Sequence, residues 1–365
     1  MNLLIKNVLL VSENDSSGVN GNIAIKDDKI VAENTFSEKE SDYVIDGKGK
    51  MAMPGLIDFH THLFNAGSGF GMNADLLFSA GVTTAVDMGT AGRANYEAFY
   101  QTGIKPRQMR VKSYLNISPI GQPGRGIVEP LNDACFMPNE MERLIDKYRD
   151  VILGIKVRVS IELVKDLGLQ PLKTAVKLGE KWHLPVAVHT TNPPTSTEEI
   201  ARILRPGDIY SHTYQGKGNT ILGNDGKVLP GIKQAQKDGV LFEVGHGRFN
   251  FDPTLAQKAL DDGFFPDIIS TDSTPRTAFI NKDLKSMPYL MSKFLNMGMK
   301  LKSVIKASIT TPAKVLGMEH ELSTLEPGTS ADIMLFDLIE KDGTKTIVPR
   351  ATFAQGNMVY RQTDF

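Results

Sequence analysis

Four histidines and one aspartate stand directly after short apolar runs of this 365-residue sequence. They are His60, His62, His189, His212 and Asp272. Neutral imidazoles and carboxylates are common ligands of divalent metal ions. Residues two apart in a strand point to the same face, so the imidazoles of His60 and His62 are expected to converge. The set predicts a metal site with nitrogen and oxygen ligands.

Lys156 lies inside an otherwise apolar run, 151–157. Burial without a partner lowers the pKa of a lysine toward neutrality. The neutral amine can react with carbon dioxide to form a carbamate, whose two oxygens can bridge two metal ions. A buried lysine–carboxylate pair, or a plain lysine at a strand end, is the alternative interpretation.

The elements that must position these residues are eight apolar runs that alternate with helix-compatible stretches. The runs are 56–59, 83–87, 110–115, 151–157, 184–188, 208–211, 240–244 and 267–271, and two of the helical patterns are Glu140 to Asp150 and Glu198 to Leu204. Such alternation is typical of parallel βα units. It predicts an α/β fold, a closed (β/α)8 TIM barrel, with a doubly wound open sheet as the alternative. In a barrel the candidate ligands would meet at the carboxyl-terminal mouth of the strands.

The two ends of the chain instead show short alternating strands, such as 23–25 and 331–337. We expect residues 1–53 and 322–365 to pair into one small β-domain. Residues 54–321 would then form the barrel.

Composition narrows the class of protein. Lys and Arg number 41 against 42 Asp and Glu, and no basic stripe is present, so no nucleic-acid partner is expected. The single cysteine, Cys135, excludes an intramolecular disulfide and a cysteine-rich metal site. No apolar stretch approaches the about 18 residues of a membrane span, and no signal peptide is apparent. We expect a cytoplasmic protein that acts on a small molecule. Its oligomeric state is open, although barrel hydrolases often form homo-oligomers.

Two sequence motifs point to a known family. Met53–His62 resembles the first-strand motif of the metal-dependent amidohydrolase superfamily, and Leu325–Asp332 resembles its C-terminal return strand. The resemblance implies His60 and His62 on a more buried metal and His189 and His212 on a more exposed one. It also implies that carboxylated Lys156 bridges both metals, and that Asp272 binds the buried metal and shuttles protons. All six positions are filled, which favours the two-metal branch.

Four further segments are similar to a dihydroorotase-like or adenine-deaminase-like subgroup. They are Gly154–Arg158, Asn116–Ser118, Val244–Gly247 and Ile269–Asp272. Some members of that subgroup deacylate N-acyl-D-amino acids or acylated (R)-hydroxy acids such as acetyl-(R)-mandelate. Two divalent metal ions, with zinc expected, would provide hydroxide near neutral pH. Asp272 would accept its proton and deliver it to the leaving amine or alkoxide.

Substrate-binding residues are harder to assign. Arg158 lies two residues beyond Lys156 and could clamp a carboxylate bidentately, although an ordinary salt bridge is the alternative. His246 and Asn116, which end two other runs, are further candidates, and His246 could instead support a ligand by hydrogen bonding. The glycine-rich segments 67–71 and 121–126 are interpreted as loops over the site.

The leading hypothesis is therefore a binuclear hydrolase of an amide or ester that bears a carboxylate. The enzymatic alternative is a cyclic amidase of the dihydroorotase type, or an adenine or purine deaminase with one metal and an ordinary Lys156. A non-catalytic barrel scaffold would need a degraded metal site, whereas all six expected ligands are present.

Overall fold

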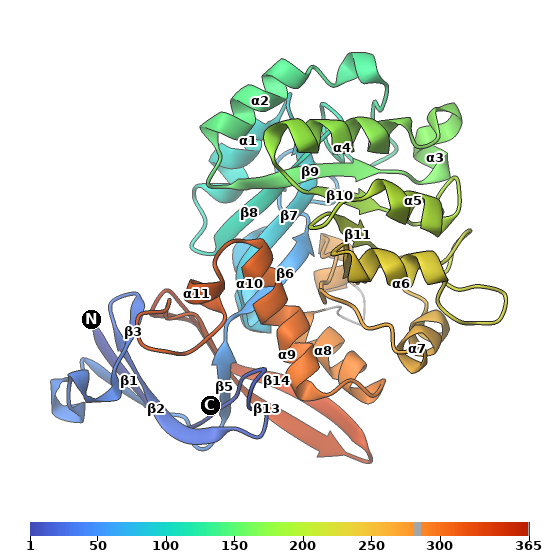
Figure 1. Ribbon diagram of the computed structural model, residues 1–365. Coiled ribbons are helices and arrows are strands. Elements are labelled where there is room, and N and C mark those ends of the chain that lie inside the picture. The colour runs from blue at the N-terminus through green and yellow to red at the C-terminus, as the bar shows by residue number, and fades with distance from the viewer. Residues whose placement is uncertain (281–285, 364) are drawn as a thin grey trace.

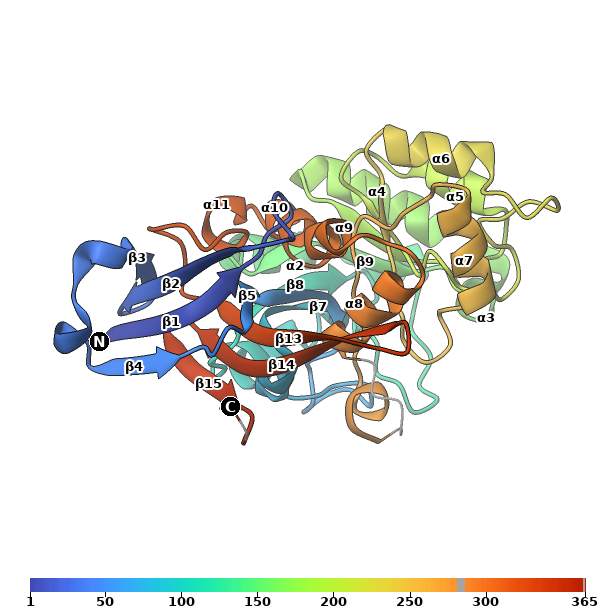
Figure 2. The ribbon, with the colours of Figure 1, turned by 90° about the horizontal axis from the view of Figure 1, so that it is seen from below.

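Two β-sheets organise the chain, one rolled up among helices and one lying beside it (Figures 1 and 2). The computed structural model describes residues 1–280, 286–363 and 365. Among these residues no helix is long and apolar enough to cross a membrane.

The rolled sheet has seven parallel strands that neighbour one another in chain order. They are β6 (Leu56–Thr61), β7 (Val82–Gly92), β8 (Arg110–Asn116), β9 (Ile152–Arg158), β10 (Val186–His189), β11 (Ile209–Ser211) and β12 (Leu241–Glu243). Each matches one predicted apolar run to within a few residues, except that β7 extends five residues further, to Gly92.

The eighth predicted run, 267–271, closes the barrel without forming a regular strand. Single parallel bridges join Ile268 to Glu243 of β12 and Ser273 to Thr61 of β6. The ladder is interrupted because two backbone amides of the run have other acceptors. The Ile269 amide donates to the Ala307 carbonyl, and the Thr271 amide donates to the Asp58 carboxylate. The α/β barrel prediction is confirmed, with this irregular eighth element.

Helices surround the rolled sheet (Figure 1). They are α1 (Tyr96–Phe99), α2 (Pro138–Lys147), α3 (Ile161–Val164), α4 (Gln170–Trp182), α5 (Thr197–Ile203), α6 (Pro230–Lys237), α7 (Pro253–Asp261), α8 (Met287–Asn296), α9 (Leu301–Ile305), α10 (Thr311–Val315) and α11 (Glu319–Leu322). Helices α2 and α5 occupy the two predicted helical stretches. At the start of α5, the Ser196 hydroxyl accepts a hydrogen bond from the Glu199 amide, a typical N-cap.

The second sheet joins both ends of the chain. Its strands are β1 (Asn2–Leu10), β2 (Val19–Lys26), β3 (Lys29–Val31), β4 (Tyr43–Asp46), β5 (Met51–Pro54), β13 (Ile333–Lys341), β14 (Thr344–Ala354) and β15 (Asn357–Arg361). β5 pairs in parallel with β1 and antiparallel with β13, so residues from opposite ends lie side by side. The predicted β-domain of both termini is confirmed, while its boundaries at 53 and 322 stay a prediction.

Contacts between the two sheets fix the start of β6. The Gly55 amide, directly before β6, donates to the carbonyl of Asp332. The carboxylate of Asp332 is 2.7 Å from the guanidinium of Arg110 on β8. This anchoring holds the strand that carries the first histidine pair.

Candidate metal centre

A cavity of about 790 Å³ opens at the carboxyl-terminal ends of the barrel strands. All six predicted ligands line it: His60, His62, Lys156, His189, His212 and Asp272. The predicted loops contribute Ser68 to Gly71 and Gln122 and Arg125. The structure therefore brings together residues that lie up to 212 positions apart in the sequence.

His60 and His62 are positioned by an irregularity in β6. Between Asp58 and Thr61 the pairing with β7 shifts, with three steps along β6 opposite two along β7. Such a bulge re-aims side chains near active sites. The ring centroids of His60 and His62 are 5.6 Å apart. Their Nε2 atoms lie 3.6 and 3.1 Å from Oδ1 of Asp272.

The other ring nitrogen of three histidines is already held by a neighbouring group. His60 Nδ1 lies 3.1 Å from Glu243 Oε2, His62 Nδ1 lies 2.8 Å from the Thr90 hydroxyl, and His212 Nδ1 lies 2.8 Å from the Gly245 carbonyl. Contacts of this kind orient the rings of metal-binding histidines and leave Nε2 for the ion.

Burial keeps several of these imidazoles neutral. It lowers the pKa of His60 and His189 well below the usual value, and that of His212 to about 3. A neutral imidazole retains the lone pair that a metal ion needs. These three imidazoles are therefore in the protonation state that favours metal binding.

Lys156 lies two residues before the end of β9, and it is 1% exposed. Among the described residues its Nζ has no hydrogen-bond partner. Space for it depends on Gly89, where an added Cβ would lie 2.5 Å from Cβ of Lys156. Burial lowers the pKa of the Lys156 ammonium. Burying an amine without a hydrogen-bond partner costs free energy, so a bound partner or a covalent modification of this nitrogen is expected.

Glu243 was not among the predicted site residues. It ends β12, is fully buried, accepts a hydrogen bond from the Ser270 hydroxyl and contacts His60. Burial raises its pKa to about 7. The signal was available in the sequence, because Glu243 is a charged residue inside the seventh apolar run, as Lys156 is inside the fourth.

The backbone is unusual at two candidate ligands. His212 and Asp272 have φ angles of 67° and 54°, in the left-handed region that residues other than glycine seldom adopt. Strained backbone of this kind clusters at functional sites. The Asp272 carboxylate is held at its other oxygen, where Asn250 Nδ2 donates to Oδ2 at 2.8 Å.

The three predicted substrate-binding residues differ in their placement. Arg158 lines the cavity, and its Nη1 forms an ion pair with the buried Glu129. Asn116 is not among the lining residues; its Nδ2 donates to the Gly89 carbonyl, and its Oδ1 accepts from the Ser118 backbone amide. His246 is also not among the lining residues. Its ring stacks on Phe251, with the two ring centroids 4.4 Å apart. Substrate contact by Asn116 and His246 thus stays a prediction, and neither residue lines this cavity.

A family model described as the amidohydrolase family matches residues 51–362. The chain belongs to the amidohydrolase family. It is 32% identical to a deacetylase of Brucella anthropi over 304 residues, which covers 82% of this chain and 74% of the relative.

Two solved structures resemble this amidohydrolase over its whole length. A dihydroorotase crystal structure aligns with a TM-score of 0.89 and 26% identity, covering 99% of this chain and 98% of that one. An adenine deaminase crystal structure aligns with a TM-score of 0.87 and 28% identity, covering 99% and 100%. The family, its deacetylase relative and these neighbours identify the chain as a hydrolytic enzyme that acts on amide bonds.

Amidohydrolases are generally metal-dependent, and the residues here fit a metal ion. Ligand atoms of His60, His212 and Asp272 lie within 4.8 Å of one another. Three rings are oriented through Nδ1, and a buried lysine nitrogen without a partner lies among them.

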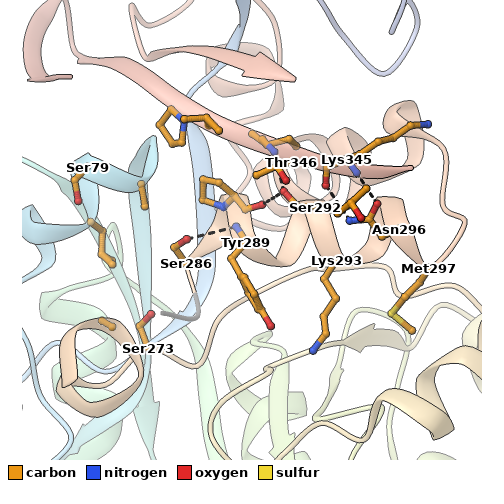
Figure 3. A pocket seen from close by; sticks show the side chains of 18 of the residues that line it. Ser79, Ser273, Ser286, Tyr289, Ser292, Lys293, Asn296, Met297, Lys345 and Thr346 are labelled. Carbon is orange, nitrogen blue, oxygen red and sulfur yellow. Dashed lines mark hydrogen bonds between the residues drawn. The ribbon is translucent and has the colours of Figure 1, made fainter. Parts of the chain in front are cut away.

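A second cavity of the amidohydrolase, about 820 Å³, lies between α8 and the hairpin β13–β14 (Figure 3). Ser292 and Asn296 of α8 hydrogen-bond to the backbone of this hairpin. Its described lining contains no histidine, cysteine, aspartate or glutamate. The candidate metal ligands therefore line the cavity at the barrel mouth and not this one.

Proposed function

We propose that this amidohydrolase is a binuclear metal-dependent deacylase. Its substrate would be an N-acyl-D-amino acid or an acylated (R)-hydroxy acid. The observation that carries the proposal is the buried Nζ of Lys156, which has no hydrogen-bond partner among the described residues and lies in a cavity with four histidines and an aspartate. Conversion of Lys156 to a carbamate would turn this costly amine into an anionic ligand with two oxygens.

The ligand set divides into two groups around Lys156. His60, His62 and Asp272 would hold one divalent ion, and His189 and His212 the other, with the Lys156 carbamate shared. Zinc is the ion expected. When bound, the metal ions would supply hydroxide near neutral pH and polarise the scissile carbonyl.

Asp272 is suited to move the proton. Its Oδ2 is held by Asn250, so Oδ1 is directed toward the imidazoles. Oδ1 would accept the proton of the attacking water and pass it to the leaving amine or alkoxide. A proton acceptor fixed by a second hydrogen bond needs no rearrangement during the reaction.

Arg158 is suited to bind the substrate carboxylate. Glu129 occupies Nη1, but the Arg158 side chain is 19% exposed and lines the cavity. An oxyanion that enters the cavity could accept a hydrogen bond from the exposed part of the guanidinium.

The deacetylase relative supports acyl removal, whereas the two structural neighbours keep a cyclic amidase or a deaminase as the alternative. Zinc-loaded enzyme is tested on N-acetyl-D-amino acids, acetyl-(R)-mandelate, dihydroorotate and adenine, with acetate, ring opening and ammonia measured separately. We expect release of acetate, which Asp272→Asn should slow at least about 100-fold. Ammonia from adenine as the sole product, or ring opening of dihydroorotate alone, would overturn the proposal.

A further inference from the structure

The barrel-mouth cavity is far more basic than the chain that forms it. Its described lining contains four arginines but a single carboxylate, that of Asp272. The whole chain, in contrast, balances 41 Lys and Arg against 42 Asp and Glu. Clefts lined by one sign of charge concentrate ligands of the opposite sign.

Three of these arginines surround the entrance. Arg125, Arg248 and Arg276, here called the rim arginines, are exposed and form no ion pair with any residue in the described ranges. Arg125 and Arg248 lie on the loops after β8 and β12, and Arg276 begins a π-helix, Arg276–Ile280, after the irregular eighth element. The fourth, Arg158, lies deeper and is already paired with Glu129.

Neighbouring groups hold two of the rim arginines in place. The stem of Arg125 passes close to Gly69, where an added Cβ would be 2.8 Å from Arg125 Cγ. The guanidinium of Arg248 lies 4.7 Å from the ring centroid of Phe249. The planar guanidinium suits carboxylate and phosphate oxygens, which it can bind through two parallel hydrogen bonds.

A substrate with one carboxylate, bound by Arg158, would leave all three rim arginines without an anionic partner. We propose that the substrate carries a second anionic group, a carboxylate or a phosphate, at the end remote from the scissile bond, and that the rim arginines bind it. This inference rests on the proposed deacylase function, which supplies the scissile bond and the first carboxylate.

Binding is measured first, because it does not depend on turnover. Calorimetric titrations of the metal-loaded enzyme compare glutarate with its monomethyl ester, and O-phospho-D-serine with D-serine. One added charge-assisted contact is expected to strengthen binding about tenfold or more. The triple variant Arg125→Gln/Arg248→Gln/Arg276→Gln should lose this preference. Arg202→Gln, an exposed arginine on α5 outside the cavity, should retain it. The pair that shows the larger preference identifies the group as carboxylate or phosphate.

Kinetics then separate this inference from the proposed function. We expect kcat/KM for N-acetyl-D-glutamate to be about tenfold higher than that for its neutral isostere N-acetyl-D-glutamine. If the second group is a phosphate, kcat/KM for N-acetyl-O-phospho-D-serine should instead be about tenfold higher than that for N-acetyl-D-serine. Deacylation without any charge preference, in turnover or in binding, would overturn the inference and leave the deacylase intact. A binding preference lost in the triple variant, with no deacylation of any substrate, would support the anion site and overturn the proposed function.

Discussion

The floor and the entrance of the barrel-mouth cavity differ in how buried their side chains are and in whether those side chains have partners. At the floor His60, His62, Lys156 and His212 are between 1% and 4% exposed, and each imidazole has a second contact that fixes its orientation. At the entrance the rim arginines are exposed and have no ion-pair partner within the described chain. At the floor, Lys156 alone lacks a hydrogen-bond partner among these four residues, whereas at the rim all three arginines lack an ion-pair partner among the described residues.

This contrast is what we expect if the floor carries out the chemistry and the rim binds the substrate. Groups that must keep one protonation state and one geometry are buried and supported from behind. The rim arginines lie on segments that follow the barrel strands, where a bound substrate would complete their hydrogen bonding. Substitutions at the floor should therefore impair chemistry or metal binding, and those at the rim should change substrate preference. The following predictions test the floor side of this comparison.

The largest effect is expected at Asp272. Asp272→Asn keeps the shape of the side chain but removes the proton acceptor, so kcat should fall about 100- to 10,000-fold. Steady-state kinetics on the best acyl substrate measure this, with circular dichroism to verify the fold. Activity within a few-fold of the unmodified enzyme would show that another group moves the proton.

A smaller effect is expected at Glu243. It does not line the cavity, but its Oε2 lies 3.1 Å from His60 Nδ1. Glu243→Gln should lower metal affinity or activity about 10- to 100-fold, the range found when partners behind metal ligands are changed. Competition with a chelator measures the affinity. Glu326→Gln, an exposed carboxylate in the C-terminal return segment, serves as the control. Equal behaviour of the two variants would mean that Glu243 has no role in holding His60.

Gly89 gives a test of the space around Lys156. It has a φ of 76°, and a Cβ there would lie 2.5 Å from Lys156 Cβ. Gly263 has a nearly identical φ of 77° with nothing within 4 Å of an added Cβ, so it reports the backbone cost alone. Gly89→Ala should lower the free energy of unfolding by about 1–3 kcal/mol more than Gly263→Ala, in line with forced packing. Urea denaturation of metal-free protein measures both free energies of unfolding. Equal losses would show that the Lys156 side chain can shift without lowering stability.

Much of the floor was predictable because strand ends follow a local pattern. An apolar run that stops at a histidine, or that contains a lysine, marks a polar residue at a strand end, and a barrel gathers all such ends at one mouth. Lys156 and His189 are examples. Extended to any charged residue inside an apolar run, the same rule would have found Glu243.

Other features depend on contacts between distant segments and left no local signal. The irregular eighth element follows from the bond between the Thr271 amide and Asp58, 213 residues earlier. The pairing of Arg158 with Glu129 joins a strand end to a loop. The left-handed backbone at His212 and Asp272 likewise reflects tertiary constraints that override local preference.

The central claim is that Lys156 becomes an anionic bridge between two metal ions. Elemental analysis of protein produced with zinc and bicarbonate tests it most directly, with Lys156→Ala as the variant and Lys173→Ala, an exposed lysine on α4, as the control. We predict about two metal ions per chain in the unmodified protein and the control, as expected of a two-metal site, and fewer in Lys156→Ala. One metal ion per chain, unchanged by Lys156→Ala, would contradict the account and bring the single-metal deaminase forward.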